Sequence, residues 1–244
     1  MQELITKLYP MSNEFDFETY LNISPNKIGI YLLDKNKLVN LYFKEQNFKN
    51  NNNLIDFNFL NEFLENNIFK IEKLIGRFIK NITLILDSEN ILTLNIGLKK
   101  KNYEKIITKK FLENSLTELK DLIYENYQDY KIMHMHIINY LFDRRYSSEF
   151  EDKVICKNLG IEIQFISVPN KLILQVDKIL LNFQIKSRNY LNQNYLQSLF
   201  KDQKISLSEM AYKSQKGYNT NEVSIIPKNL KKLGFFEKFF QLFS

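Results

Sequence analysis

The sequence predicts an α/β or α+β fold. Strand-like and helical segments alternate in the order strand, strand, helix, strand, strand, helix, strand, strand, helix, strand, helix. The 244 residues are long enough to bury a sizeable core. No apolar run reaches the length of about 20 residues that crosses a bilayer. These observations indicate one globular domain or two small ones.

The first half predicts a β-hairpin, a long helix and two further strands. The hairpin rests on two apolar runs that flank the turn chemistry of DKNK. The helix rests on Asp56 as an N-cap and on the apolar residues that follow it at helical spacing. The predicted strands are residues 27–33, 38–43, 81–86 and 91–98, the helix ends near Phe78, and residues 1–26 precede them as a leader.

The second half predicts three more helices and three more strands. Apolar residues repeat at helical spacing before Tyr127, and Pro169 can open the next helix. Gly160 stands just before a strand-like apolar run. The predicted helices are residues 108–127, 169–181 and 191–200, and the predicted strands are residues 130–142, 161–167 and 183–187.

The charge balance argues weakly against nucleic acid as a partner. The net charge is +6 and the isoelectric point is about 9.1. Almost all the positive residues are lysines, whereas arginine is the side chain that most readily forms bidentate hydrogen bonds with bases and phosphates. Cys156 is the only cysteine, which fits a reducing compartment, and the first residues lack the apolar stretch of a secretory signal. We therefore expect a cytoplasmic protein that does not bind nucleic acid.

No motif in the sequence carries a cofactor or a catalytic reaction. Phosphate-binding loops need clustered glycines, and the six glycines here are all isolated. The GxxxxGK[ST], GxGxxG and GxSxG signatures are absent. We expect no nucleotide cofactor, no catalytic residues and no enzymatic activity.

Three other groups of residues are candidate sites. His134 and His136 alternate along a predicted strand and point to one face, which would start a metal site, but no third ligand accompanies them. Cys156 has no neighbouring base in the sequence. We expect strand packing for the histidines, an inert thiol for Cys156, no metal site, and a solvated loop for the lysines at positions 99, 100, 101, 105, 109 and 110.

The last twelve residues, LGFFEKFFQLFS, form the sharpest amphipathic pattern in the chain. On a helix, all the large apolar side chains fall on one half of the wheel. The segment is too short to span a bilayer, so it fits a helix lying in the membrane interface. The predicted membrane-binding residues are Lys231, Lys232, Leu233, Phe235, Phe236, Phe239, Phe240, Leu242 and Phe243. The alternative is a terminal helix that packs on its own domain.

The layout of these elements resembles one known family. NITLIL at 81–86 stands where that family enters an inserted subdomain, and MHMHIINYLFD resembles its strand that ends in an aspartate, here Asp143. The segment from Asn182, NFQIKSRNYLNQNYLQSLF, resembles the return into the first subdomain, and the Phe-rich end resembles a carboxy-terminal membrane helix. On these grounds the chain resembles the bacterial cell-division protein FtsA, an actin-like protein that tethers the FtsZ filament to the cytoplasmic membrane.

The resemblance implies a partial actin-like (ribonuclease H-like) fold. The implied domains are a leader at 1–26, an actin-like subdomain at 27–86 and 182–202, an inserted interaction subdomain at 87–181, a tether at 203–229 and a membrane helix at 230–244. The chain departs from the family in two places. No aspartate and glycine loop follows the predicted first strand, and after about Phe200 the sequence passes to the tether where the family continues into a second actin-like half.

The function implied by the resemblance is that of a division adaptor without nucleotide. Such a protein would lie on the cytoplasmic face of the inner membrane and bind anionic lipid, itself, and division proteins such as FtsZ or later divisome components. Two alternatives stay open at this point. One is an actin-like adaptor of a pilus or type II secretion system, and the other is a soluble α/β domain.

The amphipathic end gives a direct test of membrane binding. Deletion of residues 230–244, or Phe236→Glu with Phe239→Glu, is expected to release the protein from anionic liposomes, because the apolar face of the helix is lost. Cosedimentation with vesicles measures this. Equal sedimentation of the truncated and full chains would contradict the anchor.

Overall fold

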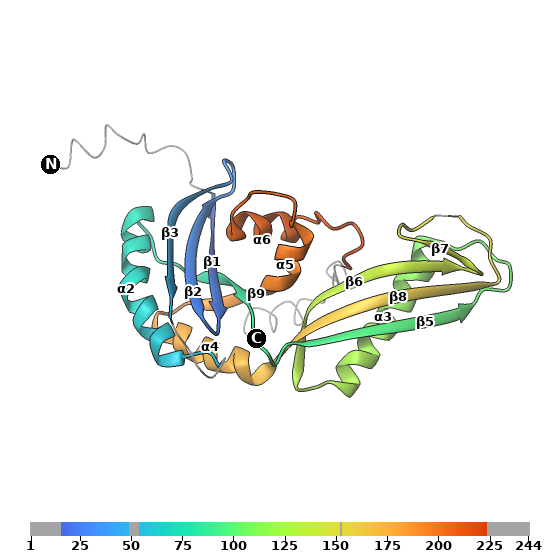
Figure 1. The fold of residues 1–244 in the computed structure, drawn as a ribbon, viewed down its shortest axis with the longest axis horizontal. Helices are drawn as coiled ribbons and strands as arrows, with labels where there is room; N and C mark the ends of the chain where they lie inside the picture. Colours follow the sequence, from blue (N-terminus) through green and yellow to red (C-terminus); the bar gives the residue numbers. More distant parts are fainter. Residues whose placement is uncertain (1–15, 49–53, 152, 224–244) are drawn as a thin grey trace, which may run out of the picture.

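The computed structural model describes residues 16–48, 54–151 and 153–223, which form two β-sheets with helices packed on them (Figure 1). The strands are β1 Phe17–Ser24, β2 Lys27–Asp34, β3 Val39–Asn47, β4 Asn81–Leu86, β5 Leu92–Lys101, β6 Tyr130–Phe142, β7 Arg145–Ser147, β8 Asn158–Pro169 and β9 Lys186–Asn192. The helices are α2 Phe57–Ile75, α3 Lys109–Asn126, α4 Asn170–Asn182, α5 Gln193–Leu199 and α6 Leu207–Gln215.

The five-stranded sheet has the order β3-β2-β1-β4-β9. β2 is antiparallel to both β1 and β3, whereas β4 runs parallel to β1 and to β9. The sheet therefore has a single reversed strand, β2, in its interior. The predicted fold class, a mixed α/β fold, is confirmed for the part of the chain that the structure describes.

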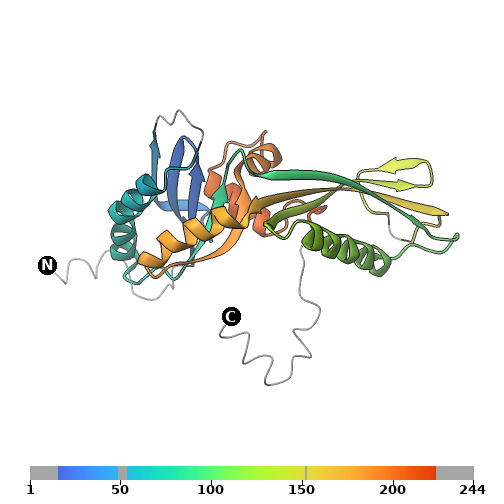
Figure 2. The ribbon, with the colours of Figure 1, turned by 90° about the horizontal axis from the view of Figure 1, so that it is seen from below.

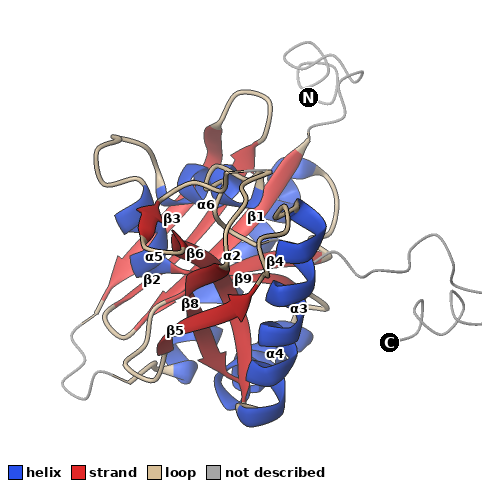
Figure 3. Ribbon diagram, turned by 90° about the vertical axis from the view of Figure 1, so that its right-hand side faces the viewer, coloured by secondary structure: helices blue, strands red, loops and turns tan. Residues whose placement is uncertain are grey.

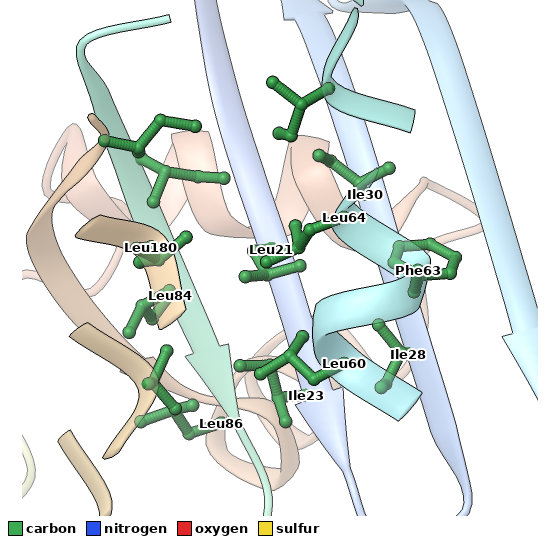
Figure 4. Packing of buried hydrophobic residues seen from close by; sticks show 14 of the residues in the cluster. Leu21, Ile23, Ile28, Ile30, Leu60, Phe63, Leu64, Leu84, Leu86 and Leu180 are labelled. Carbon is green, nitrogen blue, oxygen red and sulfur yellow. The ribbon is translucent and has the colours of Figure 1, made fainter. Parts of the chain in front are cut away.

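Helices cover both faces of this sheet, which explains why β1 and β2 are buried along almost their whole length. On one face, α2 and α4 pack on the inward residues of β1, β2 and β4 (Figure 4). On the other face, α5 and α6 cover a second cluster that includes Tyr20, Tyr31 and Leu196. The labelled side chains in Figure 4, among them Leu21, Leu64, Leu84 and Leu180, point into one shared core.

The central strand β1 lies inside residues 1–26, which were predicted to be a leader. That prediction was wrong for residues 17–24. Thr19, Asn22 and Ser24 make the segment look polar, yet each is almost completely buried. Ser24 Oγ donates to the carbonyl of Lys27 at 2.9 Å, so this polar residue serves the turn into β2. Polar content therefore concealed the strand at the centre of the sheet.

The four-stranded sheet is antiparallel and has the order β5-β8-β6-β7. It projects from the five-stranded body, and α3 lies along one of its faces (Figures 1 and 2). Leu112, Leu116 and Leu119 on α3 pack with the inward residues of β6 and β8. This matches the predicted sequence of strand, helix, strand and strand after β4.

Helix α4 packs with the five-stranded sheet, although residues 87–181 were predicted to form the inserted subdomain. Leu172, Val176 and Leu180 belong to the same core as α2. The reason is the length of β8, whose last residues stay paired with β6 beyond the end of the β5 pairing and bring Val168 into that core. Figure 3 shows α3 and α4 on the same side of the molecule, although they cover different sheets.

The predicted tether at 203–229 is also corrected for the residues that the structure describes. Ser206 caps α6 by accepting from the N–H of Glu209 at 3.2 Å, and Ala211 is fully buried. Ser208 and Ser214 are buried as well, because small side chains let α6 approach the sheet closely. Residues 224–229 lie outside the described residues, as does the predicted membrane helix at 230–244.

The placement of β1 predicts a large stability effect from a residue in the former leader. Ile23→Ala is expected to lower the free energy of unfolding by about 2–5 kcal/mol, because Ile23 is fully buried in the core under α2. Phe43→Ala on the outer strand β3, where the side chain is 65% exposed, should change it by less than about 0.5 kcal/mol. Urea denaturation measures both, and similar losses in the two variants would argue against the central position of β1.

Candidate functional site

The two sheets meet where β6, β9 and the chain after α6 come together, and a buried histidine lies at this junction. His134 on β6 is 1% exposed. Its Nε2 accepts a hydrogen bond of 2.9 Å from the backbone N–H of Asn192, the last residue of β9. Because Nε2 is an acceptor, the ring proton is on Nδ1, which donates to Glu222 Oε1 at 2.6 Å. One imidazole thus contacts three separate parts of the chain.

Glu222 lies on a short segment, residues 219–223, that we call the strap. The strap adds to the outer side of β6: the N–H of Ile137 donates to the carbonyl of Asn221 at 2.9 Å, and the N–H of Val223 donates to that of Met135 at 2.8 Å. The other oxygen of Glu222 accepts from the hydroxyl of Tyr195 on α5 at 2.9 Å. Both carboxylate oxygens of Glu222 therefore have donors inside the protein.

Two aromatic contacts complete the network. The ring of Tyr195 lies 4.1 Å from that of His134 and 5.2 Å from that of His136, measured between centroids. Burial, and then the charge of Glu222, raise the pKa of Tyr195 above its ordinary value. Burial also lowers the pKa of His136, aided by His134 and opposed by Glu222. The Nδ1 of His136 is buried and has no hydrogen-bond partner among the described residues.

A groove of about 460 Å³ lies beside this network, between the two sheets. Its walls come from β6, β9, α3 and the strap. Lys131 holds its ammonium 4.3 Å from the ring centroid of Tyr190, and Lys120 does the same over Tyr124 at 5.2 Å. Met133 and Met135 line the groove as well. Methionines, aromatic rings and cations together suit a segment with apolar side chains and carboxylates.

The edge of β6 in the groove is open for further pairing. β7 pairs with residues 140–142, and the strap bonds to residues 135 and 137. No strand among the described residues pairs with the outer side of residues 131–133, which line the groove.

A larger cavity, about 670 Å³, lies at the amino-terminal ends of β1 and β4. The junction groove is the stronger candidate, because it combines an open strand edge with cations and aromatic rings.

The sequence predictions for chemistry have mixed outcomes. His134 and His136 do share one side of β6, as predicted, and both contact Tyr195. Asp143 lies at the far end of β6, where its carboxylate accepts from the backbone N–H groups of Lys157 and Asn158 at 3.0 and 2.9 Å. Both hydrogen bonds lower the pKa of Asp143, and the one from Asn158 has the larger effect. In the described ranges no group of three or more potential ligands is arranged to hold a metal.

Cys156 and the membrane residues stand apart from the groove. Cys156 is buried, and burial raises the pKa of its thiol, which keeps it protonated. The predicted membrane-binding residues, from Lys231 to Phe243, lie outside the described residues. Among the helices that the structure describes, none is long and apolar enough to cross a membrane. Glu222, Tyr195 and Asn192 are site residues that the sequence did not reveal.

The turn between the first two strands offers little to hold a phosphate. It joins β1 to β2 through two residues, Pro25 and Asn26. Proline has no backbone N–H, and no glycine allows a close approach of the backbone to a phosphate. The sequence predicts that no phosphate loop lies near Gly29, in the segment expected to be the first strand. Gly29 lies inside β2, because β1 precedes that segment in the structure. The turn between β1 and β2 contains no glycine, so we still expect no phosphate loop there.

Comparisons with known proteins give structural neighbours only. No family model and no curated protein matches the chain. Solved structures that resemble it include a PilM–PilN type IV pilus biogenesis complex, with 9% identity and a TM-score of 0.45 over 75% of this chain. The cytoplasmic domain of EpsL, an inner-membrane component of the Vibrio cholerae type II secretion system, has 11% identity and a TM-score of 0.35 over 73% of this chain.

A third structure, a Bacteroides thetaiotaomicron protein with an actin-like ATPase fold, has 10% identity and a TM-score of 0.34 over 80% of this chain. The matches span 51% of the first neighbour and 59% of each of the other two. Two of these three proteins belong to a pilus or secretion assembly. Identities this low concern the fold alone.

The lowered pKa of His136 predicts a dependence of stability on pH. The unfolded chain takes up this proton near pH 6.5, before the folded protein does, so the stabilising contribution is present above about pH 6.5 and is lost as the pH falls toward the folded pKa. In His136→Gln, the free energy of unfolding should fall less steeply on acidification. The difference in slope is up to about 1.4 kcal/mol per pH unit, which is the limit for one proton. Urea denaturation from pH 7.5 to 5 measures it. An unchanged acid slope in the variant would refute this assignment.

Proposed function

We propose that this chain is a non-catalytic adaptor of a membrane-bound protein machine of the pilus or type II secretion kind. The observation that carries the proposal is the junction groove, which combines an open strand edge with cations, aromatic rings and methionines. The class of machine is that of two structural neighbours, the PilM–PilN complex and EpsL. The chain's own groove supports adaptor activity.

The groove suits an extended segment of a partner protein. The open side of residues 131–133 offers backbone groups to such a segment, as in strand addition. Met133 and Met135 can adjust to apolar side chains of different shapes. Lys120, Lys131 and Arg188 supply positive charge for carboxylates on the segment. The groove thus offers backbone pairing, apolar contact and charge in one place.

The absence of nucleotide chemistry is part of the proposal. The turn of Pro25 and Asn26 offers fewer backbone N–H groups than a glycine loop, and it is too short to wrap around a phosphate. The buried network of His134, Glu222 and Tyr195 satisfies its own hydrogen bonds and joins elements of the fold. Measurable ATP binding at micromolar concentration would contradict a non-catalytic adaptor.

We further propose that the protein lies on the cytoplasmic face of the inner membrane, held there by residues 230–244. The support is the amphipathic pattern of the sequence, with Lys231 and Lys232 placed to meet anionic headgroups. A single short interfacial helix binds weakly, because folding it at the surface offsets much of the gain from apolar burial. Clustering by partners or by self-association would strengthen the attachment.

A division adaptor is the second candidate. The observation that favours it is the FtsA-like order of elements together with the Phe-rich end of the sequence. Its partners would then be FtsZ or later divisome components. The two candidates share the groove and the membrane helix, so the identity of the bound partner separates them.

A photocrosslinker in the groove tests the function. Replacing Tyr124, which lines the groove and is 43% exposed, by benzoylphenylalanine in living cells is expected to trap a membrane component of a pilus or secretion assembly. The same replacement at Phe69 on α2, 71% exposed and outside the groove, is the matched control. Lys131→Glu with Arg188→Glu should reduce the crosslink at least about tenfold, because the groove loses its positive charge.

Mass spectrometry of the trapped protein then gives the outcome. A pilus or secretion component supports the first candidate, whereas a division protein supports the second and refutes the first. Equal crosslinking from Tyr124 and Phe69, or none from Tyr124, would overturn the groove as the adaptor site.

A further inference from the structure

The outer strand β5 presents a long open edge at a second surface, away from the junction groove. It pairs with β8 along its whole length, from Leu92 opposite Ser167 to Lys101 opposite Asn158, without a register shift. No strand among the described residues pairs with its other side, and Figure 2 shows β5 at the border of the sheet. Its 10 residues extend for about 33 Å.

This edge lacks most of the devices that protect outer strands from pairing. β5 contains no proline and no bulge. The other borders differ: β7 on the same sheet has 3 residues, and the pairings of β3 and β9 with their neighbours each contain an irregularity. Charge at one end is the only protection that β5 has. A long regular edge of this kind is suited to accept a further strand.

The side chains of β5 alternate between two environments. Leu94, Ile96 and Leu98 face the cluster under α3 but are only partly buried, because no strand lies beyond them. Thr93 and Asn95 are exposed on the opposite face. An added strand would therefore cover half-buried apolar side chains on the α3 side and polar ones on the other side.

Positive charge gathers where β5 ends. Lys100 pairs with Glu118, and Lys157 pairs with Glu104, so the nearby acids are already engaged. Five exposed lysines make no ion pair among the described residues: Lys99, Lys101, Lys105, Lys109 and Lys110. Two of these begin α3, whose first turn contains no acidic residue and whose amino end already carries partial positive charge.

We propose that the β5 edge binds an acidic, extended segment of a partner protein as a further strand of the four-stranded sheet. The segment alternates apolar residues, which pack beside Leu94, Ile96 and Leu98, with acidic residues that meet Lys99 and Lys101. The lysines that follow β5 extend the positive surface beyond the strand and select the acidic end of the segment. This surface is separate from the junction groove, so each can fail without the other.

Three synthetic peptides test the proposal on the full chain. The first repeats valine and glutamate five times, the second repeats valine and lysine, and the third is the first with every backbone nitrogen methylated. Fluorescence anisotropy at low salt is expected to show binding of the first and at least about tenfold weaker binding of the other two, because binding needs both acidic charge and backbone hydrogen bonds. Equal affinity for the first and third peptides would overturn strand addition.

Two charge variants separate this edge from general attraction to a basic protein. Lys99→Glu with Lys101→Glu should weaken the first peptide at least about tenfold. Lys70→Glu with Lys73→Glu, exposed residues on α2, changes the net charge equally and should leave the affinity within about twofold. Equal weakening in both variants, or none in the first, would overturn the proposal.

Hydrogen exchange and sedimentation locate and identify the occupant. Binding of the first peptide should protect alternate amides of residues 92–101, as one side of a strand becomes paired. Sedimentation velocity of the chain alone should show either no dimer or a dimer that persists in the double variant Lys99→Glu with Lys101→Glu. Such a dimer would assign the edge to a second copy of this chain and overturn the partner proposed here.

Discussion

The hydrogen bonds of the buried His134 imidazole hold the junction of this molecule together. The ring accepts from the end of β9 in one sheet, belongs to β6 of the other, and donates to Glu222 in the strap. An imidazole without these partners would be costly at 1% exposure, because a buried polar group that loses its hydrogen bond keeps its desolvation penalty of about 1–3 kcal/mol. The three parts of the chain are therefore fixed relative to one another by one side chain.

The groove follows from that arrangement. The strap covers the outer side of β6 only at residues 135–137, and Glu222 holds it there through His134 and Tyr195. Beside it, residues 131–133 keep an open edge, and Lys131 lies over Tyr190 of β9. A strap paired further along β6 would occupy the space in which a partner can pair. The same network thus sets where the body is closed and where it stays open.

How much of this could be predicted depends on how local each signal is. Asp56 was predicted as a helix cap, and its carboxylate does accept from the N–H groups of Asn58 and Phe59 at 3.0 Å. That cap needs only neighbouring residues, as does the apolar periodicity of α2. The link between His134 and Glu222 joins residues 88 positions apart, so no local pattern contains it. β1 and α6 were missed for a related reason, since buried polar residues such as Asn22 and Ser208 resemble loop residues until their packing is known.

The lysines at the end of β5 are interpreted differently once their position in the fold is known. In the sequence they resemble an ordinary solvated loop, but in the structure they stand at the end of a strand whose outer side is open. An open edge risks pairing with identical edges of other copies. In parallel pairing of two copies, the lysines of both β5 strands would gather at one end of the joined edge, where like charges repel one another. Acidic residues at those positions would instead be attracted, so the charge that protects the edge from its own kind also defines the partner that it accepts.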